Sequence, residues 1–191
     1  MGGITGILLA GGESSRMGID KSKLEYHGKT FLDIAISNLS EVADQVLLIS
    51  NHEAISGVEV YSDLVENIGP LGGLHTGLSY SNNPTNIVMA CDMPLLNPFV
   101  LKEMILNTPK NSDGMVPYLQ DKPQLLCAVF HKSIHPLLIK SIDSGTRKVM
   151  EFVEILEIYK WEVPVMHRHC FKNINTRMDY TDLISPKKES K

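Results

Sequence analysis

The stretch of sequence that decides the fold spans residues 8–21 and reads LLAGGESSRMGIDK. It continues the apolar run Ile4–Leu9, which is typical of a strand buried in a sheet. In an α/β sheet, ligands bind outside the carboxyl ends of the strands. A glycine-rich loop in this position therefore predicts a ligand-binding edge at the end of the first strand.

Further apolar runs rich in Val, Ile and Leu predict more buried strands. They lie at Gln45–Ser50, Val58–Tyr61, Ile87–Cys91, Met115–Tyr118, Leu125–Phe130 and Ile155–Val163. Helix-like stretches lie between several of them, at Phe31–Leu39, Gly73–Tyr80, Pro98–Leu106, Ile134–Ile142 and Thr146–Glu154. This alternation predicts a doubly wound α/β fold, with a mostly parallel sheet and helices on both faces.

The length predicts one compact domain. The chain has 191 residues, of which 43% are hydrophobic and 21% charged, so it can bury a core of its own. We expect this domain to span residues 1–184. Thr176 and Asp179 have the spacing of a capping box at the start of a last helix. Residues 185–191 are polar and are expected to form a flexible tail.

Composition excludes several classes of partner. Lys and Arg number 18 against 22 Asp and Glu, a net charge of −4, which argues against a nucleic-acid partner. No run approaches the roughly 20 apolar residues of a membrane span. The 3 cysteines are odd in number and far apart in the sequence, so they form neither a disulfide framework nor a paired zinc site. We therefore expect a cytoplasmic protein without a membrane partner.

The glycines of the first loop and two cations beside them suit a triphosphate. Gly11, Gly12 and Gly18 lack a Cβ, so backbone N–H groups can turn toward phosphate oxygens. Arg16 and Lys21 add positive charge at the same place. The alternative is an ordinary glycine turn with two solvated cations. The two cations together favour the phosphate-binding interpretation.

Spacing excludes two familiar nucleotide-binding loops. The run Gly28-Lys29-Thr30 would need a glycine at position 23 to form a P-loop, but Lys23 stands there. No G-x-G-x-x-G motif occurs anywhere in the chain. The sequence therefore favours neither a P-loop nucleotidase nor a dinucleotide-dependent dehydrogenase.

Asp92 is the candidate metal ligand. It lies in Cys91-Asp92-Met93-Pro94, directly after the apolar run that starts at Ile87. A carboxylate at the carboxyl end of a buried strand can hold Mg²⁺ together with substrate phosphates. The alternatives are a carboxylate that caps the following helix and a plain loop acid. With the glycine loop expected at the same edge, the Mg²⁺ interpretation is favoured.

Four motifs occur in the order seen in molybdenum cofactor guanylyltransferases, and the chain resembles that family over nearly its whole length. They are the loop from Leu9 to Lys21, Gly69-Pro70-Leu71-Gly72-Gly73, Cys91-Asp92-Met93-Pro94 and Asn173-Ile174-Asn175-Thr176. Many nucleotidyltransferases share such a glycine loop, whereas the four motifs together are far more specific. The resemblance implies a Rossmann-like nucleotidyltransferase fold, with a turn at Gly69–Gly73.

The resemblance also implies an activity. It is the transfer of GMP from GTP to the phosphate of molybdenum-loaded molybdopterin, which yields molybdopterin guanine dinucleotide and pyrophosphate with Mg²⁺ as cofactor. GTP and molybdopterin would be the small-molecule partners, and other proteins of molybdenum cofactor biosynthesis stay open as partners. Two alternatives remain: a related nucleotidyltransferase that uses CTP or a sugar phosphate, and a nucleotide-binding sensor without catalysis.

Site residues follow from the same resemblance. With Gly12 of the loop, the expected GTP-binding residues are Leu9, Ala10, Gly11, Lys21, Asn51, Asp63 and Asp92. Arg16, Lys21 and Asp92 are the expected catalytic residues, and Asp92 is the Mg²⁺ ligand. Related cytidylyltransferases usually have alanine where Gly11 stands, so guanine is the expected base. Asn51 and Asp63 each follow a predicted strand, where an amide and a carboxylate can hydrogen-bond a purine edge and a ribose hydroxyl.

The acceptor is expected to bind to the second half of the chain. Asn173 and Asn175 would lie where the two substrates meet, and Arg147 and Lys148 would face the phosphate of the pterin. Arginine grips a phosphate with two hydrogen bonds, whereas lysine acts as a point charge. The alternative is that the two cations form a solvated helix face and that the asparagines cap the final helix.

The expected mechanism is direct in-line attack of the acceptor phosphate on the α-phosphate. A phosphomonoester is largely ionised near neutral pH, since its second pKa is about 6, so a general base adds little. The barrier is mainly the approach of two anions, which bound cations lower. The chain departs from the family pattern at Thr30 and Arg177, where Pro is common, and at Gly72, where Ala is common.

Overall fold

The computed structural model describes residues 2–10, 20–50 and 57–185. The strands are β1 (Ile4–Leu9), β2 (Glu25–Tyr26), β3 (Lys29–Thr30), β4 (Gln45–Ile49), β5 (Glu59–Tyr61), β6 (Thr85–Ala90), β7 (Gly114–Leu119), β8 (Lys122–Pro123), β9 (Cys127–His131) and β10 (Ile158–Glu162). The α-helices are α1 (Phe31–Ser40), α2 (Pro70–Tyr80), α3 (Pro98–Asn107), α4 (His135–Asp143), α5 (Val149–Val153) and α6 (Arg177–Ile184). Three short 3₁₀ helices lie at η1 (Lys21–Lys23), η2 (Lys132–Ile134) and η3 (Val165–Phe171).

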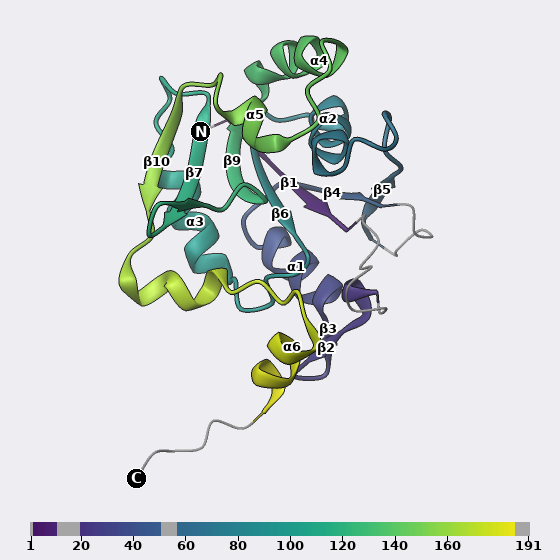
Figure 1. The fold of residues 1–191 in the computed structure, drawn as a ribbon, viewed down its shortest axis with the longest axis vertical. Helices are drawn as coiled ribbons and strands as arrows, with labels where there is room; N and C mark the ends of the chain where they lie inside the picture. Colours follow the sequence, from purple (N-terminus) through teal and green to yellow (C-terminus); the bar gives the residue numbers. More distant parts are fainter. Residues whose placement is uncertain (1, 11–19, 51–56, 186–191) are drawn as a thin grey trace.

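One mixed sheet forms the centre of the molecule, in the order β10-β7-β9-β6-β1-β4-β5, with β8 beside β7 (Figure 1). The strands β5, β4, β1 and β6 run parallel to one another, whereas β9 is antiparallel to both β6 and β7. Strand β10 is parallel to β7. The predicted α/β fold with a mostly parallel sheet is confirmed.

Helices cover both faces of this sheet (Figure 1). On one face, Ile7 and Leu9 of β1 pack with buried side chains of α2, α4 and α5. On the other face, Leu8 of β1 packs with buried side chains of α1, α3 and η3. Because successive side chains of a strand point to opposite faces, the continuous apolar run of β1 serves both cores.

Helix α2 begins earlier than the sequence predicted, since Gly69–Gly73 forms its first turn rather than a separate turn. Gly69 precedes the helix at φ 59°, and Pro70 occupies the first helical position, where a missing N–H costs nothing. A Cβ at Gly77 would lie 2.4 Å from Cγ2 of Ile7, and one at Gly73 would lie 2.8 Å from Cδ2 of Leu9. Close packing of α2 on β1 thus outweighs the low helix propensity of glycine.

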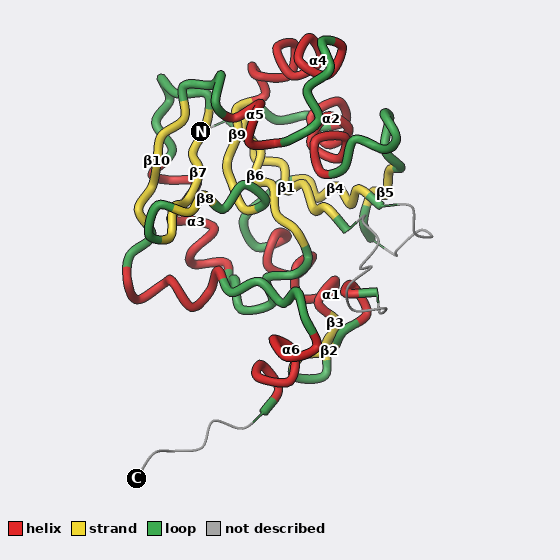
Figure 2. Tube along the Cα trace, in the orientation of Figure 1, coloured by secondary structure: helices red, strands yellow, loops and turns green. Residues whose placement is uncertain are grey.

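A small outlying layer joins the segment around β2 and β3 to the C-terminal end of the described chain. Figure 2 shows α6 beside β2 and β3, away from the main sheet. The buried side chains of Leu24, Phe31 and Ile174 form a cluster there, against which Tyr180 packs. The hydroxyl of Tyr180 also donates to the carbonyl of Glu25 at 2.9 Å. The segment before α6 is therefore held against the region that follows the glycine loop.

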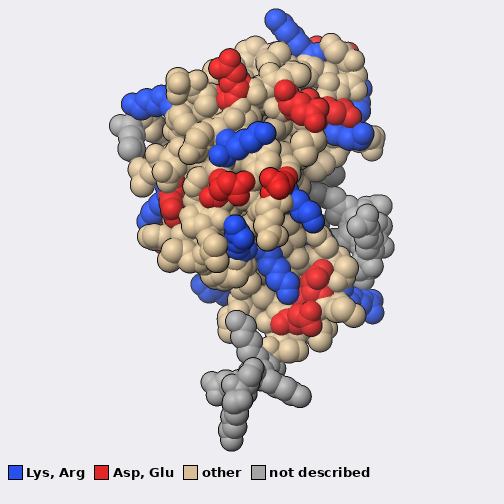
Figure 3. All heavy atoms as spheres, turned by 60° about the vertical axis from the view of Figure 1, so that its left-hand side comes forward, with Lys and Arg blue, Asp and Glu red and all other residues tan. Residues whose placement is uncertain are grey.

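Both signs of charge are mixed on the surface. On the face drawn in Figure 3, Lys and Arg side chains are interspersed with Asp and Glu side chains. Among the described residues, no helix is both long enough and apolar enough to cross a bilayer. Cys91, Cys127 and Cys170 are free thiols.

Candidate active site

The site lies where the strand order reverses. From β1 the chain builds outward to β4 and β5 and then returns to the other side of β1 as β6. Leu9 pairs with Ala90 of β6 and with Ile49 of β4, so these parallel strands end at one level. A crevice at the carboxyl ends of strands is expected at such a reversal. The segments that follow β1 and β6 both begin at this edge of the sheet.

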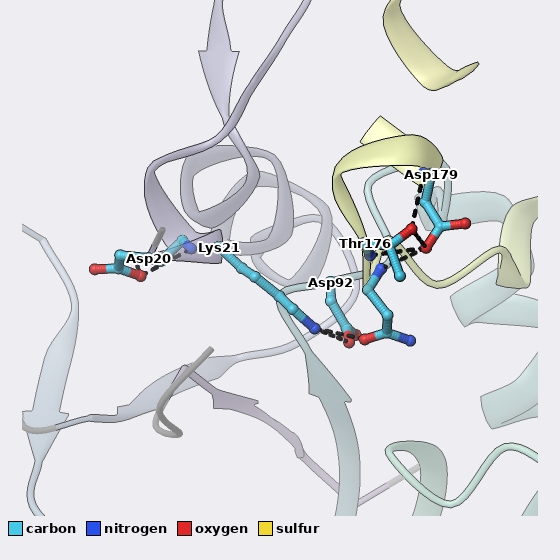
Figure 4. Close-up of polar contacts among 7 residues, drawn as sticks. Asp20, Lys21, Asp92, Thr176 and Asp179 are labelled. Carbon is cyan, nitrogen blue, oxygen red and sulfur yellow. Dashed lines mark hydrogen bonds and ion pairs between the residues drawn. The ribbon is translucent and has the colours of Figure 1, made fainter. Parts of the chain in front are cut away.

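Lys21 reaches this edge from η1, the first turn that the structure describes after the glycine loop. Asp20 caps that turn, since its Oδ1 accepts hydrogen bonds from the backbone N–H of Ser22 at 3.0 Å and from the hydroxyl of Ser22 at 2.6 Å. Figure 4 shows the Lys21 side chain extending from this turn toward Asp92. The cap fixes the backbone from which the long side chain starts.

Lys21 and Asp92 form an ion pair at the end of β6. The Lys21 Nζ lies 3.4 Å from Oδ2 of Asp92, and the two side chains are only 20% and 18% exposed. The other carboxylate oxygen, Oδ1 of Asp92, is buried and has no hydrogen-bond partner among the described residues. An ionised carboxylate oxygen rarely stays buried without a partner, so this atom fits a ligand of a hard divalent cation such as Mg²⁺.

Cys91 stands beside Asp92, in a position where burial disfavours its thiolate form. Burial, with the negative charge of Asp92 next in importance, raises the pKa of the Cys91 thiol to about 12. The thiol therefore stays protonated near neutral pH, whereas the thiolate is the reactive form of cysteine. This site does not activate Cys91 for a covalent intermediate.

Asp63 supplies a second unpartnered carboxylate oxygen. It follows β5, its Oδ1 is buried without a hydrogen-bond partner among the described residues, and burial raises the pKa of this carboxyl. A Cβ at Gly72 would lie 3.6 Å from Oδ2 of Asp63 and only 2.8 Å from the carbonyl of Val65. The close approach of this loop to α2 explains why glycine stands at position 72.

The segment Asn173–Thr176 closes the site from the far end of the chain. The backbone N–H of Ile174 donates to the carbonyl of Asp92 at 2.9 Å. The Oδ1 of Asn175 accepts a hydrogen bond from Lys21 Nζ at 2.5 Å. Three of the predicted site residues, Lys21, Asp92 and Asn175, are therefore in direct contact although they are far apart in the sequence.

Comparison with known proteins agrees with this architecture. Residues 6–159 match the model of the family described as the MobA-like NTP transferase domain. The chain belongs to this family. It is 32% identical to a protein of Clostridium perfringens strain SM101 named a probable molybdenum cofactor guanylyltransferase, over 94% of this chain and 96% of that protein. A protein of Natranaerobius thermophilus with the same name is 33% identical, over 92% of each chain.

A solved structure shares the fold. The molybdopterin-guanine dinucleotide biosynthesis protein A of Archaeoglobus fulgidus is 24% identical and superposes with a TM-score of 0.79, over 94% of this chain and 96% of its own. As a member of the MobA-like family, the chain is a nucleotidyltransferase. The resemblance inferred from the four motifs is thereby confirmed.

Some predicted GTP-binding residues of this MobA-like chain are described and others are not. Leu9 is a core residue at 7% exposure, and the N–H of Ala10 donates to the carbonyl of Ile49 at 3.0 Å. The Leu9 side chain is therefore part of the core rather than exposed to a ligand. Gly11, Gly12, Arg16 and Asn51 lie outside the described residues.

Arg147 and Lys148 lie apart from the Lys21–Asp92 pair, at a pocket of about 440 Å³. Its remaining walls are Asn67, Ile68, Gly69, Pro70, Leu125, Leu126, Val149 and Met150. The carbonyl of Leu126 accepts from the N–H of Ala90 at 2.8 Å, so this wall adjoins the end of β6, two residues before Asp92. The pocket thus joins apolar walls and two cations at the same edge of the sheet.

The pocket has some walls that the sequence predicted, Arg147 and Lys148, and others that it did not, such as Leu125 and Leu126. Leu125 and Leu126 look like strand residues by composition, but β9 begins only at Cys127. Arg147 Nη1 donates to the carbonyls of Ile142 and Thr146, and Lys148 pairs with Glu151 at 3.1 Å. The Gly69–Pro70 dipeptide is the signal in the sequence that could have pointed to the pocket, because it starts α2 at this edge.

Proposed function

We propose that this chain transfers GMP from GTP to the phosphate of molybdenum-loaded molybdopterin, with molybdopterin guanine dinucleotide and pyrophosphate as products. The observation that carries the proposal is the Lys21–Asp92 pair at the reversal of strand order, with a buried carboxylate oxygen left without a partner. The names of the relatives from Clostridium perfringens and Natranaerobius thermophilus support the identity of the substrates.

In the proposed reaction, an oxygen of the acceptor phosphate attacks the α-phosphorus of GTP. A new P–O bond forms, the bond from the α-phosphorus to the bridging oxygen breaks, and pyrophosphate leaves with that electron pair. Lys21 and Arg16 neutralise the phosphates and hold them in line. Asp92 would hold Mg²⁺, which supplies further charge neutralisation when bound. The raised pKa of the Cys91 thiol supports transfer without a covalent enzyme intermediate.

The nucleotide is proposed to bind across the ends of β1, β4 and β5. Leu9, Ala10, Gly11 and Gly12 would contact GTP, although the N–H of Ala10 is already engaged by the carbonyl of Ile49. Asn51 and Asp63 would hydrogen-bond the nucleoside. The Oδ1 of Asp63 is buried and accepts no hydrogen bond from the described residues. Because buried polar atoms usually have a hydrogen-bond partner, a donor group of the nucleoside would complete this one, which supports the role.

For the acceptor we propose the pocket beside Arg147 and Lys148, together with Asn173 and Asn175. Apolar walls suit a flat ring system, and the two cations suit its phosphate. The volume of about 440 Å³ is within the usual range for a small-molecule site. Asn175, through its contact with Lys21, would border both substrates.

We further propose that residues 1–184 act as one domain in the cytoplasm; of the predicted tail, residues 186–191 lie outside the described residues. The free state of all three thiols, Cys91, Cys127 and Cys170, supports a reducing compartment. No nucleic acid or membrane takes part in the proposed reaction.

GTP with Mg²⁺ is expected to raise the melting temperature more than CTP or ATP does at equal concentration. A ligand that binds only the native state stabilises it according to its concentration relative to Kd. At 100 times Kd the stabilisation is about 2.7 kcal/mol, which is several degrees for a chain of this size. Differential scanning fluorimetry with each nucleotide, with and without Mg²⁺, tests this. Equal shifts for GTP and CTP would remove the assignment of guanine.

Arg147→Ala is expected to raise the apparent KM for molybdopterin by at least about tenfold, or about 1.4 kcal/mol, with the Kd for GTP little changed. The guanidinium is the cation of the pocket that can bind a phosphate through two hydrogen bonds. Steady-state kinetics at varied molybdopterin concentration measures the apparent KM for the acceptor, and calorimetry with GTP measures the Kd for the nucleotide. Lys140→Ala, an exposed cation of α4 outside the pocket, is the control. A loss confined to GTP binding, or no loss, refutes the acceptor assignment.

A further inference from the structure

The start of α6 carries a hydrogen-bond network that extends beyond the helix itself. Oδ2 of Asp179 accepts from the N–H of Thr176 at 2.8 Å and from its hydroxyl at 2.8 Å, and the hydroxyl of Thr176 accepts from the N–H of Asp179 at 3.1 Å. These bonds form a capping box. The same carboxylate oxygen also accepts from the N–H of Asn175 at 3.1 Å, one residue before the cap. Asp179 therefore fixes the backbone of Asn175 as well.

The side chain of Asn175 carries this restraint into the active site through its contact with Lys21. Its Oδ1 lies 2.5 Å from Lys21 Nζ, whereas Oδ2 of Asp92 lies 3.4 Å from the same nitrogen. Both oxygens are therefore partners of the same ammonium. The amide of Asn175 is thus one of the two described partners between which the ammonium lies.

The residue before Asn175 is anchored as well. Ile174 is fully buried, and its N–H donates to the carbonyl of Asp92. After Asn175 the chain enters α6, which buries none of its residues. The Asp179 carboxylate joins the backbone of the exposed Asn175 to α6, and Tyr180 anchors that helix to the carbonyl of Glu25. A lysine side chain has high rotamer entropy, so its ammonium stays in one place only if its partner is fixed.

We propose that Asp179 is a positioning residue, which holds Asn175 so that the Asn175 amide directs the Lys21 ammonium to the position beside Asp92. This inference rests on the proposed function, in which Lys21 acts on the phosphates. Asp179 touches neither the nucleotide nor the acceptor in this scheme. It acts through Asn175, over a path of two hydrogen bonds.

The test compares Asp179→Ala with Asp179→Asn and with Asp182→Ala, an exposed carboxylate of the same helix. Asp179→Ala is expected to lower kcat about tenfold, as is typical when an outer partner of a site residue is removed. Asp179→Asn keeps an acceptor oxygen for the same N–H groups, so it should restore kcat to within about threefold of the parent. Asp182→Ala should stay within about twofold.

A double-mutant cycle separates positioning from mere stabilisation of α6. If Asp179 acts through Asn175, Asn175→Ala combined with Asp179→Ala should be no slower than Asn175→Ala alone. If Asp179 only stabilises the helix, its replacement should lower the melting temperature while kcat of the folded enzyme stays at the parental value. That result, or additive losses in the cycle, would overturn the proposal.

A second readout needs no turnover. Reductive methylation of Lys21, followed by mass spectrometry in the ligand-free protein, should be about threefold or more faster in Asp179→Ala, because the ammonium loses its fixed partner. Lys23, 76% exposed, is the internal control whose rate should not change. An unchanged Lys21 rate overturns the positioning role. A faster Lys21 rate in a protein that transfers no GMP supports positioning and refutes the proposed function.

Discussion

Asp92→Asn is expected to reduce GMP transfer by about 10²–10³-fold, because the site would lose the carboxylate that holds Mg²⁺ and with it the charge neutralisation that the cation supplies. The substitution keeps the shape of the side chain but removes the negative charge from the buried oxygen that has no partner among the described residues. An amide is a poorer ligand for Mg²⁺ than a carboxylate. Pyrophosphate release with saturating GTP and molybdopterin measures the loss.

The fold should survive this substitution. The ion pair that Asp92 makes with Lys21 is long, at 3.4 Å, and Asn175 still accepts from the ammonium when the carboxylate is gone. We therefore expect the free energy of unfolding to change by less than about 1 kcal/mol. Asp182→Asn, which removes an exposed charge from α6, is the matched control and should leave turnover unchanged. Near-parental turnover of Asp92→Asn at ordinary Mg²⁺ concentrations would contradict the role of metal ligand.

Lys21→Ala is expected to lower kcat/KM for GTP by about 10²-fold or more, since charged hydrogen bonds to phosphate contribute about 1.5–3 kcal/mol each and this ammonium can make more than one. Its Nζ already lies between Asp92 and Asn175, so it needs little reorganisation to meet a phosphate there. Single-turnover kinetics at varied GTP separates lost binding from slower chemistry.

Lys23→Ala is the control, because it removes the same positive charge from the same turn as Lys21→Ala. Its Nζ lies 3.7 Å from Asp20 and its side chain is 76% exposed, so kcat/KM should stay within about twofold of the parent. Lys21→Arg keeps the charge with a different shape and should recover only part of the activity, because a planar guanidinium cannot occupy the place of an ammonium between the same two oxygens. If Lys21→Ala were as active as Lys23→Ala, Lys21 would have no part in transfer.

Local patterns in the sequence predicted most of the elements. The apolar run Ile4–Leu9 matches the bounds of β1, and Thr176 caps α6 with Asp179 as predicted from their spacing. Both signals act within a few residues: an unbroken apolar run fits a strand covered on both faces, and a capping box joins side chain to backbone three positions apart. Such features need no knowledge of the rest of the chain.

Patterns that depend on tertiary packing were predicted less well. The glycines at 69, 72 and 73 indicated a turn, yet α2 runs through them because its backbone packs closely on β1. Strand β9 was predicted from Leu125, but it starts at Cys127, and Leu126 instead borders the pocket. In each case a contact with another element outweighed the local preference.

The sequence by itself determined the α/β class, the first strand with its glycine loop, the carboxylate that follows β6 and the cap of α6, because each is a local property of a few neighbouring residues. Only the tertiary structure decided which of these features come into contact with one another. Lys21 lies 71 positions from Asp92 and 154 from Asn175, and their contact follows from the return of β6 to the side of β1 and from the packing of Ile174 and Tyr180 beside β2 and β3. Strand order and the docking of a distant segment are set by burial of apolar surface across the whole chain, which no local pattern encodes.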